Sequence, residues 1–183
     1  MSKSIGLKVM KQRTVKVTLY KVTKQTANQA DNTADQTPDA IELQKFLNDI
    51  FKPQLNVSFD VKYADSPLSL NWDVPSNPAD PASGNGILDS NADDNESISA
   101  ELDNILGNRP SGRPESNIDV FLLGTDHFIN NVAWATTRRT ENGNGANACW
   151  VVGDALQGRS MTALMRTISH EIGHVFVGYG HRT

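Results

Sequence analysis

The chain is poor in the features that mark several classes of protein. It has one cysteine, Cys149, so no disulfide can form within it and a disulfide-stapled scaffold is excluded. No apolar run approaches the length that spans a bilayer, and the start, residues 1–17, lacks the apolar segment of a secretory signal. Basic residues do not cluster and the net charge is −4, so we expect neither nucleic acid nor membrane as a partner.

Length and composition indicate one ordinary soluble domain. The 183 residues are 38% hydrophobic and 21% charged, which is enough for a substantial core, and no internal repeat is visible. We therefore predict a single domain over residues 1–183. Residues 65–95 are rich in Pro, Asn, Asp, Ser and Gly, and we expect a long polar surface excursion there.

Five segments have the patterns of β-strands. Apolar and polar residues alternate in 14–22 and 57–63, as in half-buried strands, and the apolar face of the second is formed by Val57, Phe59, Val61 and Tyr63. Residues 117–124, NIDVFLLG, form a largely apolar run, which is typical of a parallel strand covered on both faces. Two shorter apolar stretches, 131–136 and 148–152, are expected to form a sheet edge.

Helices are predicted between and after these strands. Thr37 and Pro38 have the residue types of an N-cap and a first helical position, apolar residues follow at helical spacing, and Pro53 should end that helix. A short helix is expected over 98–106 and a final helix from Ser160. This order predicts an α/β (α+β) fold with a twisted mixed sheet, a βαβ crossover and a terminal helix.

The final helix carries the sequence HEIGH. At 100° per residue its apolar side chains form one stripe that should face the core: Met161, Leu164, Met165, Ile168, Ile172, Val175 and Phe176. His170 and His174 fall on the opposite face beside Ala163 and Thr167, and we expect them to look into a cleft. Residues i and i+4 have Cβ atoms about 5–6 Å apart, so the two imidazoles can share one metal ion.

Glu171 stands next to the first histidine, where a carboxylate can take a proton from a metal-bound water. The alternative is a chance match of five residues in a surface helix with solvated histidines. The apolar stripe on the other side of the helix and the glycines that follow the motif favour the metal site.

A catalytic zinc ion requires three protein ligands and one open position, and His181 is the predicted third ligand. If Gly178 ends the helix in the left-handed conformation, the next three residues span up to about 10 Å, enough to return to the metal. A glutamate on a later helix, the rival arrangement, is not expected because no residue follows Thr183 in the given sequence. His127 is interpreted as a loop or cleft-rim residue.

The segment HEIGHVFVGYGH resembles the zinc-binding consensus HExxHxxGxxH of the metzincin metallopeptidases. His170, Glu171 and His174 match the consensus, whereas the glycine and the third histidine occur one position later, at Gly178 and His181. A one-residue insertion in this turn is physically bridgeable. The predicted order of elements is also similar to the upper subdomain of metzincins.

The resemblance implies a zincin-like fold whose lower subdomain is missing or very short, since no methionine follows Met165 to form the family's Met-turn. It implies one catalytic Zn²⁺, with Glu171 as general base and three ligands, His170, His174 and His181. The implied activity is that of an endopeptidase acting on a protein or peptide substrate that lies extended against an edge strand, at 131–136 or 148–152. Secretion to the extracellular space is implied as well.

Two other functions remain open at this point. The first is a non-catalytic zinc-binding or protein-interaction module. It is favoured by the position of His181 two residues before Thr183, the last residue given, because a terminal segment frays unless it is tied down. The second is a zinc hydrolase that acts on something other than a peptide.

Weaker signals carry less. Oxygen-bearing residues alternate as in a calcium loop, at Asp89, Asn91, Asp93 and Asn95. Asp94 replaces the sharp-turn glycine and Ala100 the bidentate glutamate, so a solvated acidic loop is favoured over calcium. Cys149 is expected in the core, and Tyr179 is expected to pack over the turn instead of donating to an oxyanion.

Overall fold

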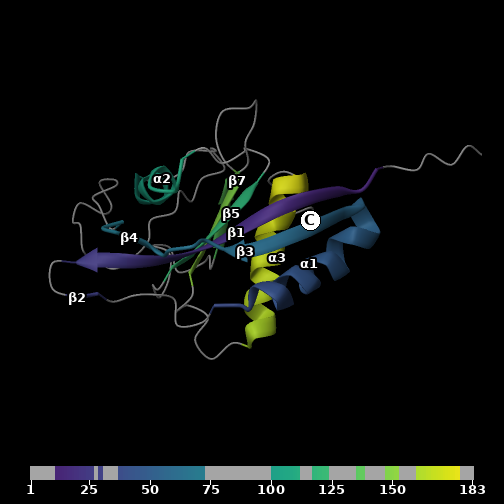
Figure 1. The fold of residues 1–183 in the computed structure, drawn as a ribbon, viewed down its shortest axis with the longest axis horizontal. Helices are drawn as coiled ribbons and strands as arrows, with labels where there is room; N and C mark the ends of the chain where they lie inside the picture. Colours follow the sequence, from purple (N-terminus) through teal and green to yellow (C-terminus); the bar gives the residue numbers. More distant parts are fainter. Residues whose placement is uncertain are drawn as a thin grey trace, which may run out of the picture.

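The structure of the chain is a computed structural model. The described residues are 11–26, 29–30, 37–72, 100–111, 117–123, 135–138, 147–152 and 160–177. Their elements, in chain order (Figure 1), are β1 Arg13–Thr26, β2 Gln29–Ala30, α1 Ala40–Leu55, β3 Val57–Tyr63, β4 Leu68–Leu70, α2 Ala100–Gly107, β5 Ile118–Leu123, β6 Ala135–Arg138, β7 Asn147–Val152 and α3 Met161–Val177. This is a mixed α/β fold, as the sequence predicts.

The seven described strands form one mixed sheet. Its order is β2-β1-β5-β7-β6, and β3 and β4 also pair with β1. β1 runs parallel to β3, β4 and β5, and β5 runs parallel to β7. β6 is antiparallel to β7, and β2 is antiparallel to β1. The predicted βαβ unit is confirmed, because α1 connects the parallel neighbours β1 and β3.

Helices cover both faces of the sheet. Figure 1 shows β5 and β7 between α2 on one side and α3 on the other. On the side of α1 and α3, the core includes Val17, Val120 and Val151, and on the side of α2 it includes Phe121 and Trp150. All six side chains of β5 are buried, which confirms the prediction of a parallel strand covered on both faces.

Both ends of α1 differ from the sequence prediction. The N-cap is Asp39, not Thr37, because Oδ1 of Asp39 accepts hydrogen bonds from the backbone N–H groups of Ile41 and Glu42, at 2.9 and 3.0 Å. Pro53 does not end the helix but lies inside its last turn. The helix ends instead at the left-handed residue Asn56, with φ 53°, whose N–H donates to the carbonyl of Lys52 at 3.1 Å.

The predicted excursion at 65–95 is wrong at its beginning. Residues 68–70 form β4, which pairs with β1 through the register Val22↔Leu68. Leu70 and Trp72 are buried in the core beneath α2. Leu68, Leu70 and Trp72 alternate with polar residues, but the polar composition of the surrounding segment masked this short pattern. Their burial depends on the pairing of β4 with β1. Residues 73–95 lie outside the described residues.

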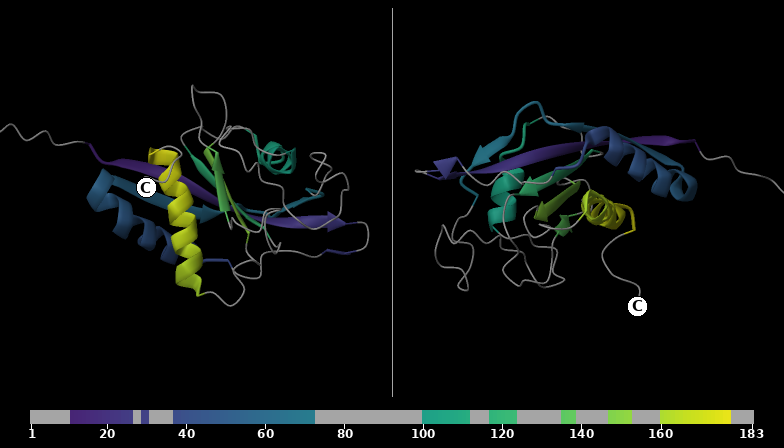
Figure 2. Two further views of the ribbon diagram at one scale, coloured as in Figure 1. Left: turned by 180° about the vertical axis from the view of Figure 1, so that it is seen from behind. Right: turned by 90° about the horizontal axis from the view of Figure 1, so that it is seen from below.

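α3 lies on the same face of the sheet as α1. In Figure 2 the yellow helix α3 lies between α1 and the green strands, and it contacts α1, β6 and β7. Among the described residues, no helix is long and apolar enough to cross a membrane. A single domain over residues 1–183 stays a prediction.

Candidate metal centre

The helix that carries the histidines forms as its periodicity predicts. It spans Met161–Val177, and Ser160 precedes it, with its carbonyl accepting from Ala163 N at 2.8 Å. The predicted stripe faces the core: Leu164, Ile168 and Ile172 are fully buried, Val175 is buried, and Met161, Met165 and Phe176 pack partly buried against them. The burial of this stripe leaves the opposite side of α3 for the histidines.

The two histidines meet on that opposite side. His170 is exposed and His174 is half-buried. Their Nε2 atoms lie 3.0 Å apart, and the two ring planes are nearly perpendicular, at 87°, with centroids 4.6 Å apart. The predicted i, i+4 pairing is confirmed, and both rings turn the same nitrogen toward a common point.

This geometry fits a single metal ion. Two nitrogen ligands at 2.0–2.1 Å from one tetrahedral ion are about 3.3 Å apart, so the observed 3.0 Å separation would need to open only slightly. Ligand atoms of His170, Glu171 and His174 all lie within 4.8 Å of one another. The group could therefore bind a metal ion, and imidazole with carboxylate suits several divalent ions.

Glu171 is more deeply placed than the histidines. Glu171 is 7% exposed, and Ser169, two residues before it, is also buried. The hydroxyl of Ser169 donates to the carbonyl of Met165 at 2.7 Å, and that of Thr167 donates to the carbonyl of Ala163 at 3.1 Å. Both hydroxyls are satisfied by their own helix, so the polar chemistry of this segment is concentrated in His170, Glu171 and His174.

Several sequence predictions fall on residues that the structure does not describe. These are the third ligand His181, the loop residue His127, the turn residues Gly178 and Tyr179, and the acidic stretch 89–95. They stay predictions. Cys149 lies on β7 and is fully buried, as predicted for a core residue.

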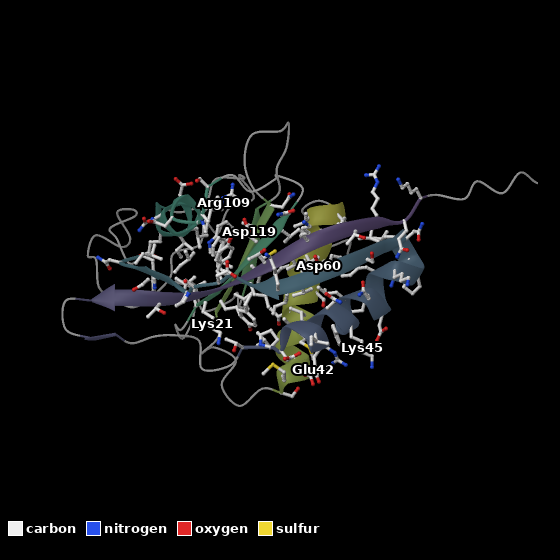
Figure 3. All side chains as sticks on the ribbon, in the orientation of Figure 1. Lys21, Glu42, Lys45, Asp60, Arg109 and Asp119 are labelled. Atoms are coloured by element: carbon white, nitrogen blue, oxygen red, sulfur yellow. The ribbon has the colours of Figure 1, made fainter. Side chains whose placement is uncertain are left out.

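One buried charged pair was missed by the sequence analysis. Asp119 lies on β5 with a fully buried side chain, and its Oδ2 accepts from Nη1 of Arg109 at 2.8 Å on the α2 side of the sheet (Figure 3). The available signal was an aspartate inside the apolar run IDVFLL, since a carboxylate in a buried strand requires a partner. The ion pair joins the segment that follows α2 to β5.

Comparisons with known proteins add no evidence on the function of this site. No protein-family model, curated protein or solved structure matches the chain. The metal-binding interpretation therefore depends on two converging imidazoles and one adjacent carboxylate, on a helix whose other side is buried.

Proposed function

We propose that this chain is a zinc-dependent endopeptidase of metzincin-like type. The observation that carries the proposal is the 3.0 Å approach of the His170 and His174 Nε2 atoms, with Glu171 between them in sequence. Zinc is the proposed ion because imidazole is among its preferred ligands and an open coordination position suits hydrolysis. The two histidines are the proposed ligands in the described part of the chain, and His181 is the proposed third.

The described residues have distinct roles in this reaction. A bound zinc ion would supply Lewis acidity for the scissile carbonyl and for an attacking water at neutral pH. Glu171 accepts the proton of the attacking water and returns it to the leaving amine. The buried setting of Glu171 limits the freedom of its carboxylate, so the base is held near the imidazoles before substrate arrives.

The order of elements supports a zincin-like fold within this proposal. A strand, a crossover helix and a parallel strand come first, further strands follow, and the histidine helix comes last. This is the order that the resemblance to the metzincin upper subdomain implies.

Strand pairing supports one of the two candidate substrate strands. β7, at 147–152, lies between β5 and β6, so both of its edges are paired. β6, at 135–138, is the last strand in the described sheet and contacts α3. An extended peptide would therefore add to β6, beside the helix that carries the proposed ligands.

The test is zinc content together with proteolysis of a denatured protein substrate. We expect about one zinc per chain, lost in His170→Ala and His174→Ala. Glu171→Gln should keep zinc but lose activity by about 10²- to 10⁴-fold, the usual contribution of a general base. Glu42→Gln, the same change at an exposed position on α1, serves as the matched control and should behave as wild type.

The alternatives give different results in the same experiment. A non-catalytic zinc-binding module would retain zinc and hydrolyse nothing. A hydrolase of another class would hold zinc, spare the protein substrate and cleave a non-peptide ester or amide in a substrate panel. Equal proteolysis by wild type and Glu171→Gln would refute the role given to that carboxylate.

A further inference from the structure

Three aromatic rings meet on the core side of the last turn of α3. They belong to Phe51 of α1, Phe59 of β3 and Phe176 of α3. The ring centroids are 5.4 Å apart for Phe51 and Phe59, 5.8 Å for Phe51 and Phe176, and 6.0 Å for Phe59 and Phe176. The rings are tilted or edge-on, arrangements that aromatic pairs prefer, so this cluster joins three elements by specific contacts.

The same cluster reaches the backbone between the two histidines. A Cβ atom built on Gly173 would lie 4.0 Å from Cζ of Phe51, so the HEIGH segment passes directly over that ring. Phe51 thus contacts α3 at Phe176 and approaches it at Gly173. These two positions flank His174 in the sequence.

This segment of α3 has little rigidity of its own. Gly173 is a poor helix former because it has the largest backbone freedom of all residues. The helix ends at Val177, only three residues after His174, so His174 lies in the last turn, where the carbonyls have no N–H partners within the helix itself. The orientation of His174 therefore depends on tertiary contacts from the core side.

The geometry points to Phe51 as a positioning residue for the metal ligands, an inference that rests on the proposed metal site. Its ring supports the backbone from the core side of the helix, at Gly173 and through Phe176. Two nitrogens bind one ion well only when their separation and direction are set in advance. Removing the ring lets the turn rotate or fray. This separates His170 from His174 and lowers the affinity for the metal ion.

The test compares Phe51→Leu with a matched control on the other face of the same sheet. The control is Phe121→Leu, because the Phe121 ring likewise contacts two other aromatic rings, 5.2 Å from Tyr20 and 5.7 Å from Trp150, but belongs to the core beneath α2. Zinc affinity is measured by competition with a chromogenic chelator, and ligand geometry by the visible spectrum of the cobalt-substituted full chain. Amide hydrogen exchange of residues 170–177 is measured on the metal-free protein.

We expect Phe51→Leu to weaken zinc binding about tenfold, at the lower end of the effect of residues that orient ligands, and to alter the cobalt spectrum. Amide exchange in 170–177 should accelerate. Phe121→Leu should lower the melting temperature but change none of these three readouts. If Phe51→Leu does not fold, Phe51→Met, which keeps most of the side-chain volume, is measured in the same way.

The outcomes separate this inference from the proposed function. Wild-type zinc affinity and wild-type exchange in the Phe51 variants would overturn the positioning role and leave the metal site intact. Equal weakening by Phe121→Leu would also overturn it, because the effect would then follow general stability. A wild-type chain that binds no zinc would overturn the proposed function and this inference together.

Discussion

The side chain of Tyr63 shows how one residue links the sheet to the start of α1. Its hydroxyl donates to the carbonyl of Pro38 at 2.7 Å, and the ammonium of Lys21 lies 5.2 Å from the centre of its ring. Burial raises the pKa of Tyr63 above its ordinary value of 10.0; a hydrogen bond with Thr37 opposes this shift, and the charge of Asp39 adds to it. The folded chain therefore holds the phenolic proton more tightly than the unfolded chain does.

This shift predicts a loss of stability in alkali. Below about pH 10, Tyr63 is protonated in both states and its contribution is fully present. As the pH rises further, the unfolded chain loses the proton first, so the contribution falls until the pH passes the raised folded pKa. Tyr63→Phe should cost about 1 kcal/mol at pH 7, and its deficit should shrink above pH 10. Urea denaturation of both proteins from pH 7 to 11 measures this deficit. A difference in the free energy of unfolding that stays constant over this range would contradict the prediction.

The α2 side of the sheet depends on the ion pair between Arg109 and Asp119. Arg109 is 24% exposed, whereas the carboxylate is inside the protein. A buried charge that loses its partner destabilises a fold strongly, although two apolar residues of similar volume can replace the whole pair at little cost. The pair therefore fixes how the segment after α2 lies on β5 more than it adds net stability.

Removal of one partner is predicted to cost much more than removal of both. Arg109→Met keeps the length of the side chain but not its charge, and we expect it to lower the free energy of unfolding by about 3 kcal/mol. The double variant Arg109→Met with Asp119→Leu should recover most of that loss. Denaturant titrations of the wild type and the single and double variants give the comparison. A loss below about 1 kcal/mol in the single variant would show that the guanidinium is dispensable.

At the scale of the whole molecule, the edge of the sheet formed by β3 is covered by side chains of α1. One edge of β3 pairs with β1. On its other edge, the backbone N–H groups of Phe59 and Val61 donate hydrogen bonds to side chains of α1. Oδ1 of Asn48 accepts from Phe59 at 2.8 Å, and Oε1 of Gln44 accepts from Val61 at 2.9 Å. These amides occupy positions where another strand would bind, so this edge is protected against pairing with a second chain.

Loss of these two amides should expose the edge. The double variant Gln44→Ala with Asn48→Ala leaves two backbone donors without their partners, and we expect a loss of about 1–3 kcal/mol for each and a larger mass by light scattering as chains pair. Asp49→Ala, an exposed change on the same helix, is the control and should remain as the wild type. An unchanged mass and stability in the double variant would contradict the protective role.

Local patterns were enough to predict the elements that the site depends on. The 3.6-residue period of α3 placed its apolar stripe inside and His170 and His174 together outside, because side-chain direction on a helix follows from sequence spacing alone. The alternation in β1 and β3 and the largely apolar run of β5 predicted those strands, again from sequence spacing alone.

What the sequence by itself determined is therefore the character of each segment: the strands, the helices and the i, i+4 pair of imidazoles. Only the tertiary structure decided which partners these segments meet. It selected Asp39 over Thr37 as the cap of α1, paired β4 with β1, joined Arg109 to Asp119, left β6 at the end of the described sheet and set Phe51 beneath the histidine turn. The physical reason is that periodicity is local, whereas pairing and packing join residues that are far apart in the chain.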